Sequence, residues 1–425
     1  MLEKILNRTK NFGRAALLAT ALLMPACTKP VDETKPVNKP TPADSIHVDH
    51  TIYSLPVTFF NSTDLHWINY SPTNFNPNVQ QYPSESSIRE DLKTLVDHGY
   101  NSIDTYGSDN ILGQVPQIAK SVGIKGVVMG IWDPTNSEEF NNAVKAKDFV
   151  DGYCIGNEGL TNGRYNMMTL KKAADSLRTI TNKPVTTTEP STTYTVDIKK
   201  FGDWIFPNAH PYWSGIKEPR AAAKWTKQKY DDFSKGTDKV VVLKEVGLPS
   251  AGETGLSEAN QNLYYNTLDS LMTSKKAMFS YFEAFDQPWK NNLPVEPYWG
   301  LFDKNRQPKE VAKPQIIITS APAMGGFENL YGKVRNVLPD SAAVSTYIDV
   351  AGTWWVKPYW STPLSTVKSD GSWGCDVTTG GIDQTASKIN VYLVTKDFDP
   401  NSTNPSKLPP VVANDKVKSY VIINR

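Results

Sequence analysis

The sequence predicts a (β/α)8 barrel that is followed by a small all-β, sandwich-like domain. Short apolar β runs alternate with amphipathic helical stretches from about Trp67 to Phe302, and eight such runs can be counted. Beyond Pro308 the helical pattern gives way to β segments separated by Gly, Asp and Pro turns. Eight strand–helix units in about 240 residues are typical of this barrel. An open doubly wound sheet would have fewer strands and usually a Gly-rich phosphate turn, and no such turn follows an early strand.

The amino terminus has the features of a processing segment. Basic residues precede the apolar run 15–23, which is too short to span a bilayer. Ala26 directly before Cys27 resembles the lipobox of bacterial lipoproteins, and this implies cleavage before Cys27 and acylation of that cysteine. An ordinary secretory signal is the alternative. We expect a signal peptide over 1–26, a Pro/Thr/Lys-rich tether over 27–50, and an outer-membrane lipoprotein of a Gram-negative bacterium that faces the periplasm or the cell surface.

The barrel is expected over 51–313. Two of its helical stretches, 86–97 and 170–181, place apolar residues such as Leu92 and Leu177 on one face. Strands that alternate with helices build a parallel sheet through right-handed crossovers. The eight expected strands are Trp67 to Tyr70, Asn101 to Tyr106, Lys125 to Ile131, Gly152 to Gly156, Pro184 to Thr188, Trp204 to Ala209, Lys239 to Val246 and Met278 to Phe282.

The sandwich-like domain is expected over 314–425. Its aromatic residues Trp354, Trp355, Tyr359 and Trp360 form either a glycan-binding platform or part of the sandwich core. A rigid spacer is the alternative role for the whole domain. The expected strands are Gln315 to Ser320, Val344 to Val350, Trp354 to Trp360, Ser372 to Val377 and Lys388 to Val394.

Composition excludes some classes of partner. A net charge of +1, from 45 basic and 44 acidic residues, provides no basic footprint for nucleic acid. The 11 Trp and 19 Tyr suit carbohydrate, because flat aromatic faces stack on sugars. Cys154 and Cys375 fall in different expected domains, so we expect two free thiols. No Cys/His cluster has zinc-site spacing, and we expect no metal, no other cofactor and a monomer.

Polar and aromatic residues recur where each expected strand ends, which is where the active sites of such barrels gather. Scattered loop residues would rarely repeat a carboxylate or an aromatic at the same point of successive units. From strand one to strand eight the ends carry Asn69 and Tyr70; Asp104, Tyr106 and Asp109; Trp132 and Asp133; Asn157 and Glu158; Glu189; His210, Tyr212 and Trp213; Glu245; and Glu283 and Asp286.

Two glutamates stand out among these residues. Glu158 ends strand four and Glu245 ends strand seven, so the two carboxylates lie across the mouth from one another. Double displacement at a glycosidic bond needs one carboxylate that attacks and one carboxylic acid that protonates the departing oxygen. We predict that Glu245 is the nucleophile and that Glu158, its pKa raised by neighbouring negative charge, is the acid/base. Asn157 is expected to bind the sugar 2-hydroxyl, and Tyr212 to hydrogen-bond Glu245.

At these residues the chain resembles glycoside hydrolase family 17, within a clan of retaining barrels. The likeness runs from about Tyr70 to Lys309. Its motifs are Gly156-Asn157-Glu158, Lys244-Glu245-Val-Gly-Leu-Pro-Ser250, Phe282-Glu-Ala-Phe-Asp286-Gln-Pro-Trp-Lys290 and Glu296-Pro-Tyr-Trp-Gly300-Leu-Phe302, with weaker agreement at Tyr100 to Asp109 and Thr188-Glu-Pro190.

The resemblance implies a retaining hydrolase of β-1,3-glucan. Trp132, Trp213, Trp289 and Trp299 are candidate stacking platforms, of which Trp299 lies within a family motif, and each of them can equally be core packing. The expected substrate-binding residues are Tyr70, Tyr106, Asn157, Tyr212, Glu283, Lys290 and Trp299.

The chain departs from the family at two positions near the expected sugar site. Asp104 stands where the family usually has Arg, which removes a donor near the nucleophile. Gln287 stands where the family usually has an acidic residue, which removes a charge that would interact with Lys290. We expect these changes to affect linkage preference or the balance of hydrolysis and transfer.

Other functions remain open from the sequence. A transglycosylase that remodels β-glucan would use the same glycosyl-enzyme intermediate. A hydrolase of mixed-linkage or β-1,6-glucan would keep the mechanism and change the substrate. A surface glycan-binding lipoprotein with a catalytically dead barrel is the third alternative, and retention of both Glu158 and Glu245 argues against it. Endo or exo action depends on loops that the sequence does not resolve.

Overall fold

The computed structural model describes residues 54–61, 65–273, 278–400 and 415–425. The expected signal peptide, the lipobox at Cys27 and the tether over 27–50 lie outside the described residues. Within the described ranges, no helix has both the length and the apolar character needed to cross a bilayer.

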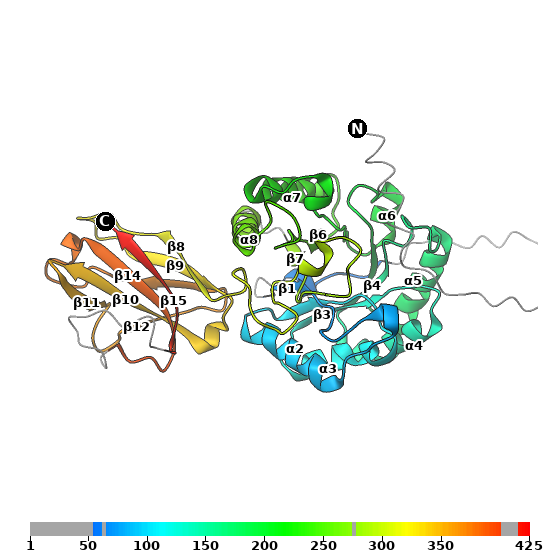
Figure 1. Cartoon of the computed structure of the whole chain (residues 1–425), viewed down its shortest axis with the longest axis horizontal. Coiled ribbons are helices and arrows are strands. Elements are labelled where there is room, and N and C mark those ends of the chain that lie inside the picture. Colours follow the sequence, from blue (N-terminus) through cyan, green and yellow to red (C-terminus); the bar gives the residue numbers. More distant parts are fainter. Residues whose placement is uncertain (1–53, 62–64, 274–277, 401–414) are drawn as a thin grey trace, which may run out of the picture. The chain divides into compact units, whose positions relative to one another are not determined.

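A curled sheet of parallel strands forms the centre of the N-terminal described part, with helices around it (Figure 1). Its strand order is β5-β4-β3-β2-β1-β7-β6, and this arrangement confirms the predicted (β/α)8 barrel. The strands are β1 (Trp67–Asn69), β2 (Ser102–Asp104), β3 (Gly126–Ile131), β4 (Gly152–Asn157), β5 (Val185–Thr188), β6 (Val242–Val246) and β7 (Met278–Tyr281).

The expected sixth strand, 204–209, closes the ring without forming a regular strand. Ile205 bridges Val241 and Asn208 bridges Pro190, both in the parallel sense. On one side Ile205 N donates to Val240 O at 2.9 Å, and on the other Asn208 N donates to Glu189 O at 3.0 Å. The ladder is interrupted because Pro207 has no backbone N–H to donate.

Helices connect the strands and cover the outside of the sheet. In α2 the Ser84 side chain accepts from Ser87 N as the N-cap, and the buried face carries Ile88, Leu92 and Leu95. The helices are α2 (Glu85–Asp97), α3 (Val115–Ser121), α4 (Ser137–Lys145), α5 (Met167–Thr181), α6 (Val196–Phe201), α7 (Pro219–Ser234) and α8 (Glu258–Thr273). The 3-10 turns of this part are η1 (Phe59–Asn61), η2 (Pro77–Val79), η3 (Asn110–Gln114), η4 (Lys147–Phe149), η5 (Tyr212–Ser214) and η6 (Glu296–Tyr298).

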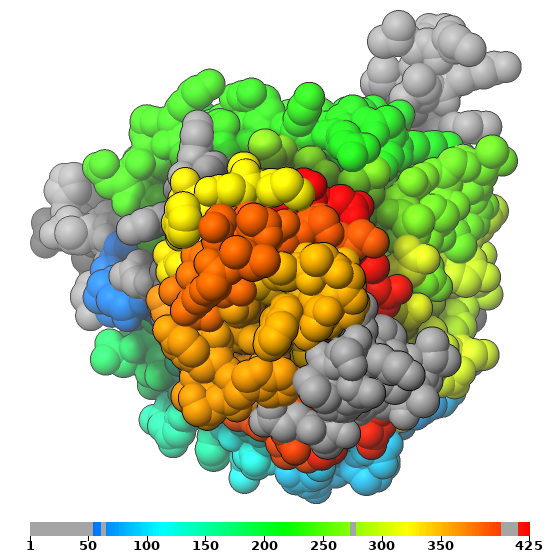
Figure 2. All heavy atoms as spheres, turned by 90° about the vertical axis from the view of Figure 1, so that its left-hand side faces the viewer, coloured from blue at the N-terminus to red at the C-terminus, as the bar shows by residue number. Residues whose placement is uncertain are grey.

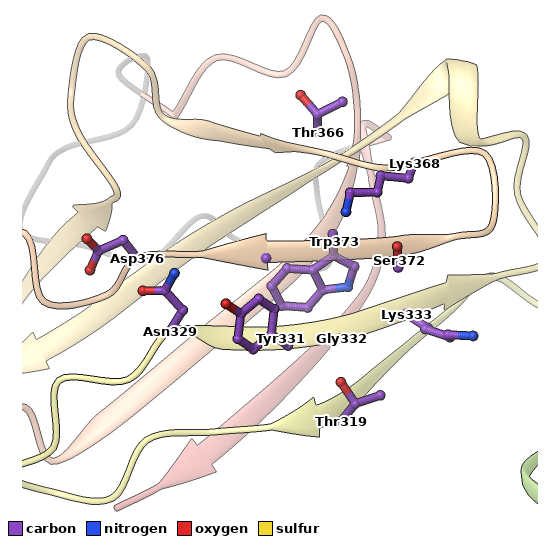
Figure 3. Close-up of a pocket in the computed structure, with 11 residues that line it drawn as sticks. Thr319, Asn329, Tyr331, Gly332, Lys333, Thr366, Lys368, Ser372, Trp373 and Asp376 are labelled. Atoms are coloured by element: carbon purple, nitrogen blue, oxygen red, sulfur yellow. The ribbon is translucent and has the colours of Figure 1, made fainter. Parts of the chain in front are cut away.

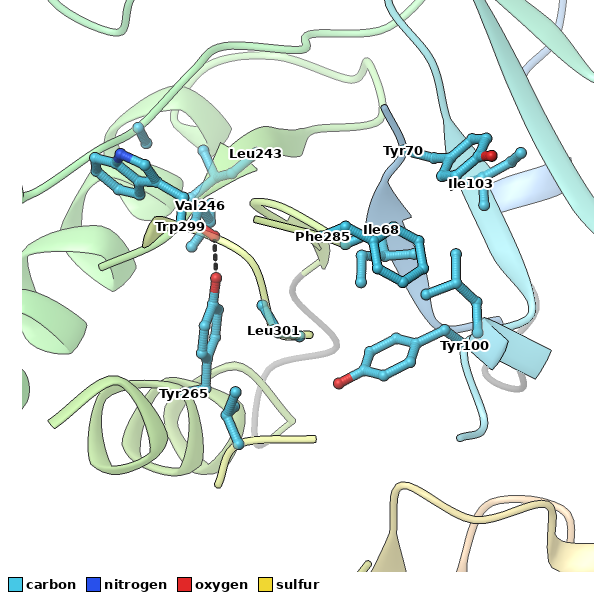
Figure 4. Close-up of a cluster of buried hydrophobic side chains, with 14 of the residues drawn as sticks. Ile68, Tyr70, Tyr100, Ile103, Leu243, Val246, Tyr265, Phe285, Trp299 and Leu301 are labelled. Carbon is cyan, nitrogen blue, oxygen red and sulfur yellow. Dashed lines mark hydrogen bonds between the residues drawn. The ribbon is translucent and has the colours of Figure 1, made fainter. Parts of the chain in front are cut away.

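The barrel is packed both inside and outside. A cluster that includes Trp67, Cys154, Trp204 and Val242 brings together side chains from well-separated strands, as expected for a filled barrel interior. A larger cluster lies between strands and helices, and Figure 4 shows part of it. These buried layers hold the strand ends in fixed positions, which a precise catalytic site requires.

The C-terminal part consists of two antiparallel sheets, in the orders β11-β10-β14-β15, with β12 on β10, and β13-β9-β8. Its main core cluster draws Ile316 and Leu330 from one sheet and Val344 and Leu393 from the other, which makes it a sandwich. Its atoms are yellow to red in Figure 2. The strands are β8 (Gln315–Ser320), β9 (Leu330–Arg335), β10 (Ala342–Val350), β11 (Thr353–Lys357), β12 (Leu364–Thr366), β13 (Ser372–Cys375), β14 (Lys388–Thr395) and β15 (Val417–Asn424), with turns η7 (Pro339–Ser341) and η8 (Asp383–Thr385).

The aromatic residues at β11 divide between the two expected roles. Trp354 packs against a core cluster, whereas Trp355, Tyr359 and Trp360 are exposed. The expected strand 354–360 ends at Lys357, because Pro358 follows it. Strands β9, β12 and β15 were not expected from the sequence. Cys154 and Cys375 are both buried and free, which confirms the prediction of two free thiols.

Candidate active site

Glu158 lies at the end of β4 in an unusual backbone conformation. Its φ is +54°, directly after Gly156 at +80° and Asn157. The pairing of β4 with β5 also shifts register between Cys154 and Asn157. Non-glycine residues with positive φ are strained and tend to occur where function fixes the geometry. The local backbone therefore turns the Glu158 side chain away from the direction that a regular strand would give it.

The Glu158 carboxyl group favours the protonated state. Asn208 Nδ2, from the segment that closes the barrel, donates to Glu158 Oε1 at 2.8 Å. Burial and then the negative charge of Glu245 raise the pKa of Glu158, and the Asn208 hydrogen bond only partly offsets them. A carboxyl group that keeps its proton to higher pH is suited to act as a general acid.

Glu245 is held by two donors. Lys244 Nζ donates to Glu245 Oε1 at 2.9 Å, and His210 Nε2 lies 3.0 Å from Glu245 Oε2. The pairing of β6 with β7 shifts register between Leu243 and Val246. This irregularity lets the neighbours Lys244 and Glu245 meet, although consecutive strand residues ordinarily point to opposite faces.

These donors keep Glu245 ionised. Burial alone would raise its pKa, but the Lys244 ammonium and the His210 hydrogen bond outweigh burial and lower the pKa of Glu245 to about 2. Glu158 and Glu245 are thus shifted in opposite directions, one toward the acid and one toward the carboxylate. Such divergence between neighbouring carboxyl groups is how an acid and a nucleophile are assigned in glycoside hydrolysis.

Lys244 places a cation near Asp104, the position at which the resembling family usually has an arginine. Its side chain is 1 % exposed, and its Nζ lies 3.2 Å from Asn157 Oδ1 and 3.8 Å from Asp104 Oδ1. The ammonium also lies 4.1 Å from the centre of the Tyr106 ring. The expected loss of a donor near the nucleophile is therefore wrong, because Lys244 supplies one from the adjacent position in the chain.

Asp104 completes this buried charge cluster. Asn69 Nδ2 and Ser280 Oγ both donate to its carboxylate. Burial raises the pKa of Asp104 to about 6, although Lys244 acts against that shift. Because Lys244 Nζ is closer to Glu245 than to Asp104, its positive charge stabilises mainly the Glu245 carboxylate.

The expected hydrogen bond from Tyr212 to Glu245 is wrong. His210 takes that place, and Tyr212 lies instead near Glu253, where burial and then the Glu253 carboxylate raise the pKa of Tyr212. The cause is local geometry. Pro211 starts the 3-10 turn η5, which carries the Tyr212 ring beside Trp213, with their ring centres 4.7 Å apart.

Two further expected binding residues lie in the core. Tyr70 is 1 % exposed and donates from its hydroxyl to Asp91 Oδ2 at 2.9 Å, so it faces helix α2. Its neighbour Asn69 takes the inward position because side chains alternate along a strand. Trp299 is 2 % exposed and packs against His210, with ring centres 5.1 Å apart. Tyr70 therefore has no free face for a sugar, and Trp299 supports the histidine instead of offering an open platform.

Glu283 and Lys290 form a pair at the end of β7. Lys290 Nζ lies 2.8 Å from both oxygens of the fully buried Glu283. Lys290 therefore has a carboxylate partner despite the amide at position 287. Gln287 donates to Ser71 O at 3.1 Å and accepts from Trp289 Nε1 at 2.8 Å, which fixes the loop after β7.

Glu189 anchors the loop that follows Glu158. It is fully buried, and its carboxylate accepts from Leu160 N at 2.8 Å and from Thr161 N at 3.1 Å. The sequence alone gives Asn208 no distinct role and marks His210 only as a strand-end residue. An Asn and a His two residues apart, within an otherwise apolar run, were the available signal.

Exposed aromatic side chains remain at two strand ends. Trp132, after β3, is 42 % exposed, and the Arg164 guanidinium lies 4.4 Å from its ring centre. Trp213, after 204–209, is 47 % exposed and is backed by Trp299 at 5.9 Å. Partly exposed indole rings of this kind can stack on sugars. Among the residues the structure describes, no group of three or more His, Cys, Asp or Glu could hold a metal ion.

A model of the BtgE/BtgC glycoside hydrolase domain matches residues 68–300. A probable glucan endo-1,3-beta-glucosidase, btgC, of Aspergillus clavatus is 27 % identical over 308 residues, which are 60 % of this chain and 44 % of that protein. A glucan 1,3-beta-glucosidase of Arthroderma benhamiae is 26 % identical over 268 residues, 54 % of this chain and 85 % of that protein. The chain thus spans less than half the length of the btgC relative.

The chain also has similarity to solved structures. A glycoside hydrolase family 17 beta-1,3-glucanosyltransferase from Rhizomucor miehei is 23 % identical, with a TM-score of 0.49, and covers 59 % of this chain and 97 % of its own. An endo-laminarinase from Formosa Hel1_33_131 is 18 % identical, with a TM-score of 0.49, and covers 59 % of this chain and 86 % of its own. The domain match extends over more than half of the 425 residues. The chain belongs to the family of the BtgE/BtgC glycoside hydrolase domain.

Proposed function

We propose that the protein is a retaining glycoside hydrolase that cleaves β-1,3-glucan, with Glu245 as nucleophile and Glu158 as acid/base. The observation that carries the mechanism is the opposed environment of the two carboxyl groups. Lys244 and His210 lower the pKa of Glu245, whereas burial and the charge of Glu245 raise that of Glu158. The names of the relatives from Aspergillus clavatus and Arthroderma benhamiae support β-1,3-glucan as substrate.

Each step assigns a task to a named group. Ionised Glu245 attacks the anomeric carbon while Glu158 protonates the departing oxygen, so a covalent glycosyl-enzyme forms and the shortened chain leaves. Once Glu245 is neutralised in the ester, the pKa of Glu158 falls. Glu158 can then remove a proton from water, which opens the ester and restores Glu245. Asn157, whose Oδ1 lies beside Lys244 Nζ, keeps its amide N–H groups for a sugar hydroxyl.

The test of this function is a substrate panel. The purified protein is incubated with laminarin, mixed-linkage glucan, pustulan and cellulose, and the released sugars are separated by size. We expect release from laminarin, with products that shorten over time. Release of sugars from another glucan alone would show that the proposed substrate is wrong and would leave the proposed mechanism unchanged. Products longer than the starting oligosaccharide would show transfer to sugar in place of water, and binding without release would leave a glycan-binding protein.

We further propose that the protein is a monomer anchored in the outer membrane by acylation of Cys27, facing the periplasm or the cell surface. The support is the Ala26-Cys27 pair that ends a basic and apolar leader. In the native host, labelled fatty acid should be incorporated into the protein and lost in Cys27→Ser. Retention of label in Cys27→Ser, or release of the unsubstituted protein without detergent, would contradict the anchor.

A further inference from the structure

The β13-β9-β8 sheet of the sandwich carries a pocket on its outer face. Its volume is about 480 Å³, and Figure 3 shows residues that line it. Burial alternates along β13, with Trp373 and Cys375 toward the core and Gly374 toward solvent. Polar and aromatic side chains from several segments surround the exposed backbone: Thr319, Tyr331, Lys333, Thr366, Ser372 and Asp376.

Gly374 explains why this face is hollow and why Tyr331 lies flat on it. Gly374 is the cross-strand partner of Tyr331. A Cβ on Gly374 would lie 2.9 Å from two ring carbons of Tyr331, so the ring rests on bare backbone. The Tyr331 side chain is still 48 % exposed. An aromatic ring with one face on a sheet and the other open is suited to stack on a pyranose ring.

The charges around the pocket point to a neutral ligand. Lys333 and Lys368 line it together with Asp376. Hydrogen bonds from Ser372 lower the pKa of nearby Asp370, and the two lysines add to that effect. The two ammonium groups are thus offset by Asp376 in the lining and by Asp370 near the lysines, which leaves no net charge to recruit a polyanion. The hydroxyl, amide, ammonium and carboxylate groups that remain can hydrogen-bond sugar hydroxyls as donors or acceptors.

We propose that this pocket is a second β-glucan binding site, in which a glucose ring stacks on Tyr331 and the surrounding polar groups bind its hydroxyls. The identity of the glycan rests on the proposed function of the barrel. The site would hold the enzyme on an insoluble polysaccharide while the barrel cleaves it. The exposed aromatic residues of β11, represented by Trp355, are the rival location within the same domain.

The experiment compares the full-length protein with Tyr331→Ala, Tyr331→Phe and Trp355→Ala, and uses Tyr420→Ala, 49 % exposed on the other sheet, as a matched control. Depletion by insoluble β-1,3-glucan is measured together with turnover of insoluble glucan and of short soluble oligosaccharides. We expect Tyr331→Ala to bind insoluble glucan roughly two- to twelvefold more weakly, since aromatic contacts of this kind contribute about 0.5–1.5 kcal/mol. Its turnover of insoluble glucan should fall while that of short oligosaccharides is unchanged, and Tyr331→Phe and the two other variants should bind normally.

Thr366→Trp gives a second approach, because it fills the pocket from an exposed position and keeps the ring over Gly374. It should weaken binding even if Tyr331→Ala fails to fold. Normal glucan binding by folded Tyr331→Ala and Thr366→Trp would show that the pocket is not the site. Loss of glucan binding in Trp355→Ala alone, or binding of the protein only to an acidic polysaccharide, would also overturn the proposal. The proposed function fails separately, if the unsubstituted protein does not cleave short oligosaccharides.

Discussion

Glu245→Ala should lower turnover of β-1,3-gluco-oligosaccharides by at least about a thousandfold, because the covalent intermediate forms on the carboxylate that the substitution removes. Glu158→Ala should cost roughly 10²–10⁴-fold on the same substrates, the usual contribution of a general acid. The loss in Glu158→Ala should be much smaller with an aryl glycoside, whose leaving group departs without a proton. Initial rates with both substrate types measure these effects, and Glu328→Ala, an exposed carboxylate in the sandwich, is the matched control.

Added azide separates the two roles by stereochemistry. In Glu245→Ala a small anion can enter the space left by the carboxylate and attack directly, so the product should be an α-glycosyl azide. In Glu158→Ala the glycosyl-enzyme still forms from an aryl glycoside, and attack on it should give the β-azide. Proton NMR of the anomeric hydrogen distinguishes the two products. The reverse pattern would exchange the assignments, and turnover within tenfold of the control in Glu245→Ala would exclude it as the nucleophile.

The barrel and its two glutamates could be predicted because both depend on order along the chain. Apolar runs of the right length mark strands, and in a parallel barrel all strand ends meet at one edge. Glu158 and Glu245 each end such a run. Their proximity at the mouth of the barrel could therefore be predicted without knowing which way either side chain points. The segment 204–209 was predicted as a strand for the same reason, and Pro207 explains its broken ladder.

The supporting residues were harder to predict, because their roles depend on which way a side chain points. Tyr70 and Asn69 are neighbours, and a one-residue difference in phase decides that Asn69 faces inward and Tyr70 faces α2. Irregularities in strand pairing remove even that rule. The register shift in β6 brings Lys244 beside Glu245. The turn η5 carries Tyr212 away from Glu245, so that His210 contacts Glu245 in its place.

Lys244→Met should move the acidic limb of the pH profile of kcat/KM to higher pH. Glu245 must be ionised to attack, and with Lys244 present its pKa is about 2. Without the ammonium, burial and the negative charge of Asp104 raise the pKa of Glu245, and the hydrogen bond from His210 opposes them. The pKa of Glu245 should therefore rise. The alkaline limb, which follows the proton on Glu158, should move little. Lys235→Met, an exposed lysine at the end of α7, controls for the loss of a positive charge.

The free energy of unfolding should depend on pH through the same ionisation of Glu245. The pKa of Glu245 is lowered in the folded protein, so its ionised form contributes stability above the ordinary value of 4.5, and this is lost as the pH falls toward 2. Lys244→Met leaves two buried carboxylates without their cation, which should cost about 3–5 kcal/mol near neutral pH. Because protonation relieves that cost, the variant should lose less stability at pH 4 than at pH 7. Denaturant unfolding at the two pH values measures the difference.

Adding Asp104→Asn tests whether the effect is electrostatic. The amide preserves the size of the side chain and removes the negative charge that would otherwise raise the pKa of Glu245 in Lys244→Met. The double variant should therefore regain part of the stability, and its acidic limb should move part of the way back to lower pH. A packing defect at Lys244 would lower kcat at every pH and would not be relieved by a change at Asp104. An unmoved acidic limb in Lys244→Met would mean that His210 alone keeps Glu245 ionised.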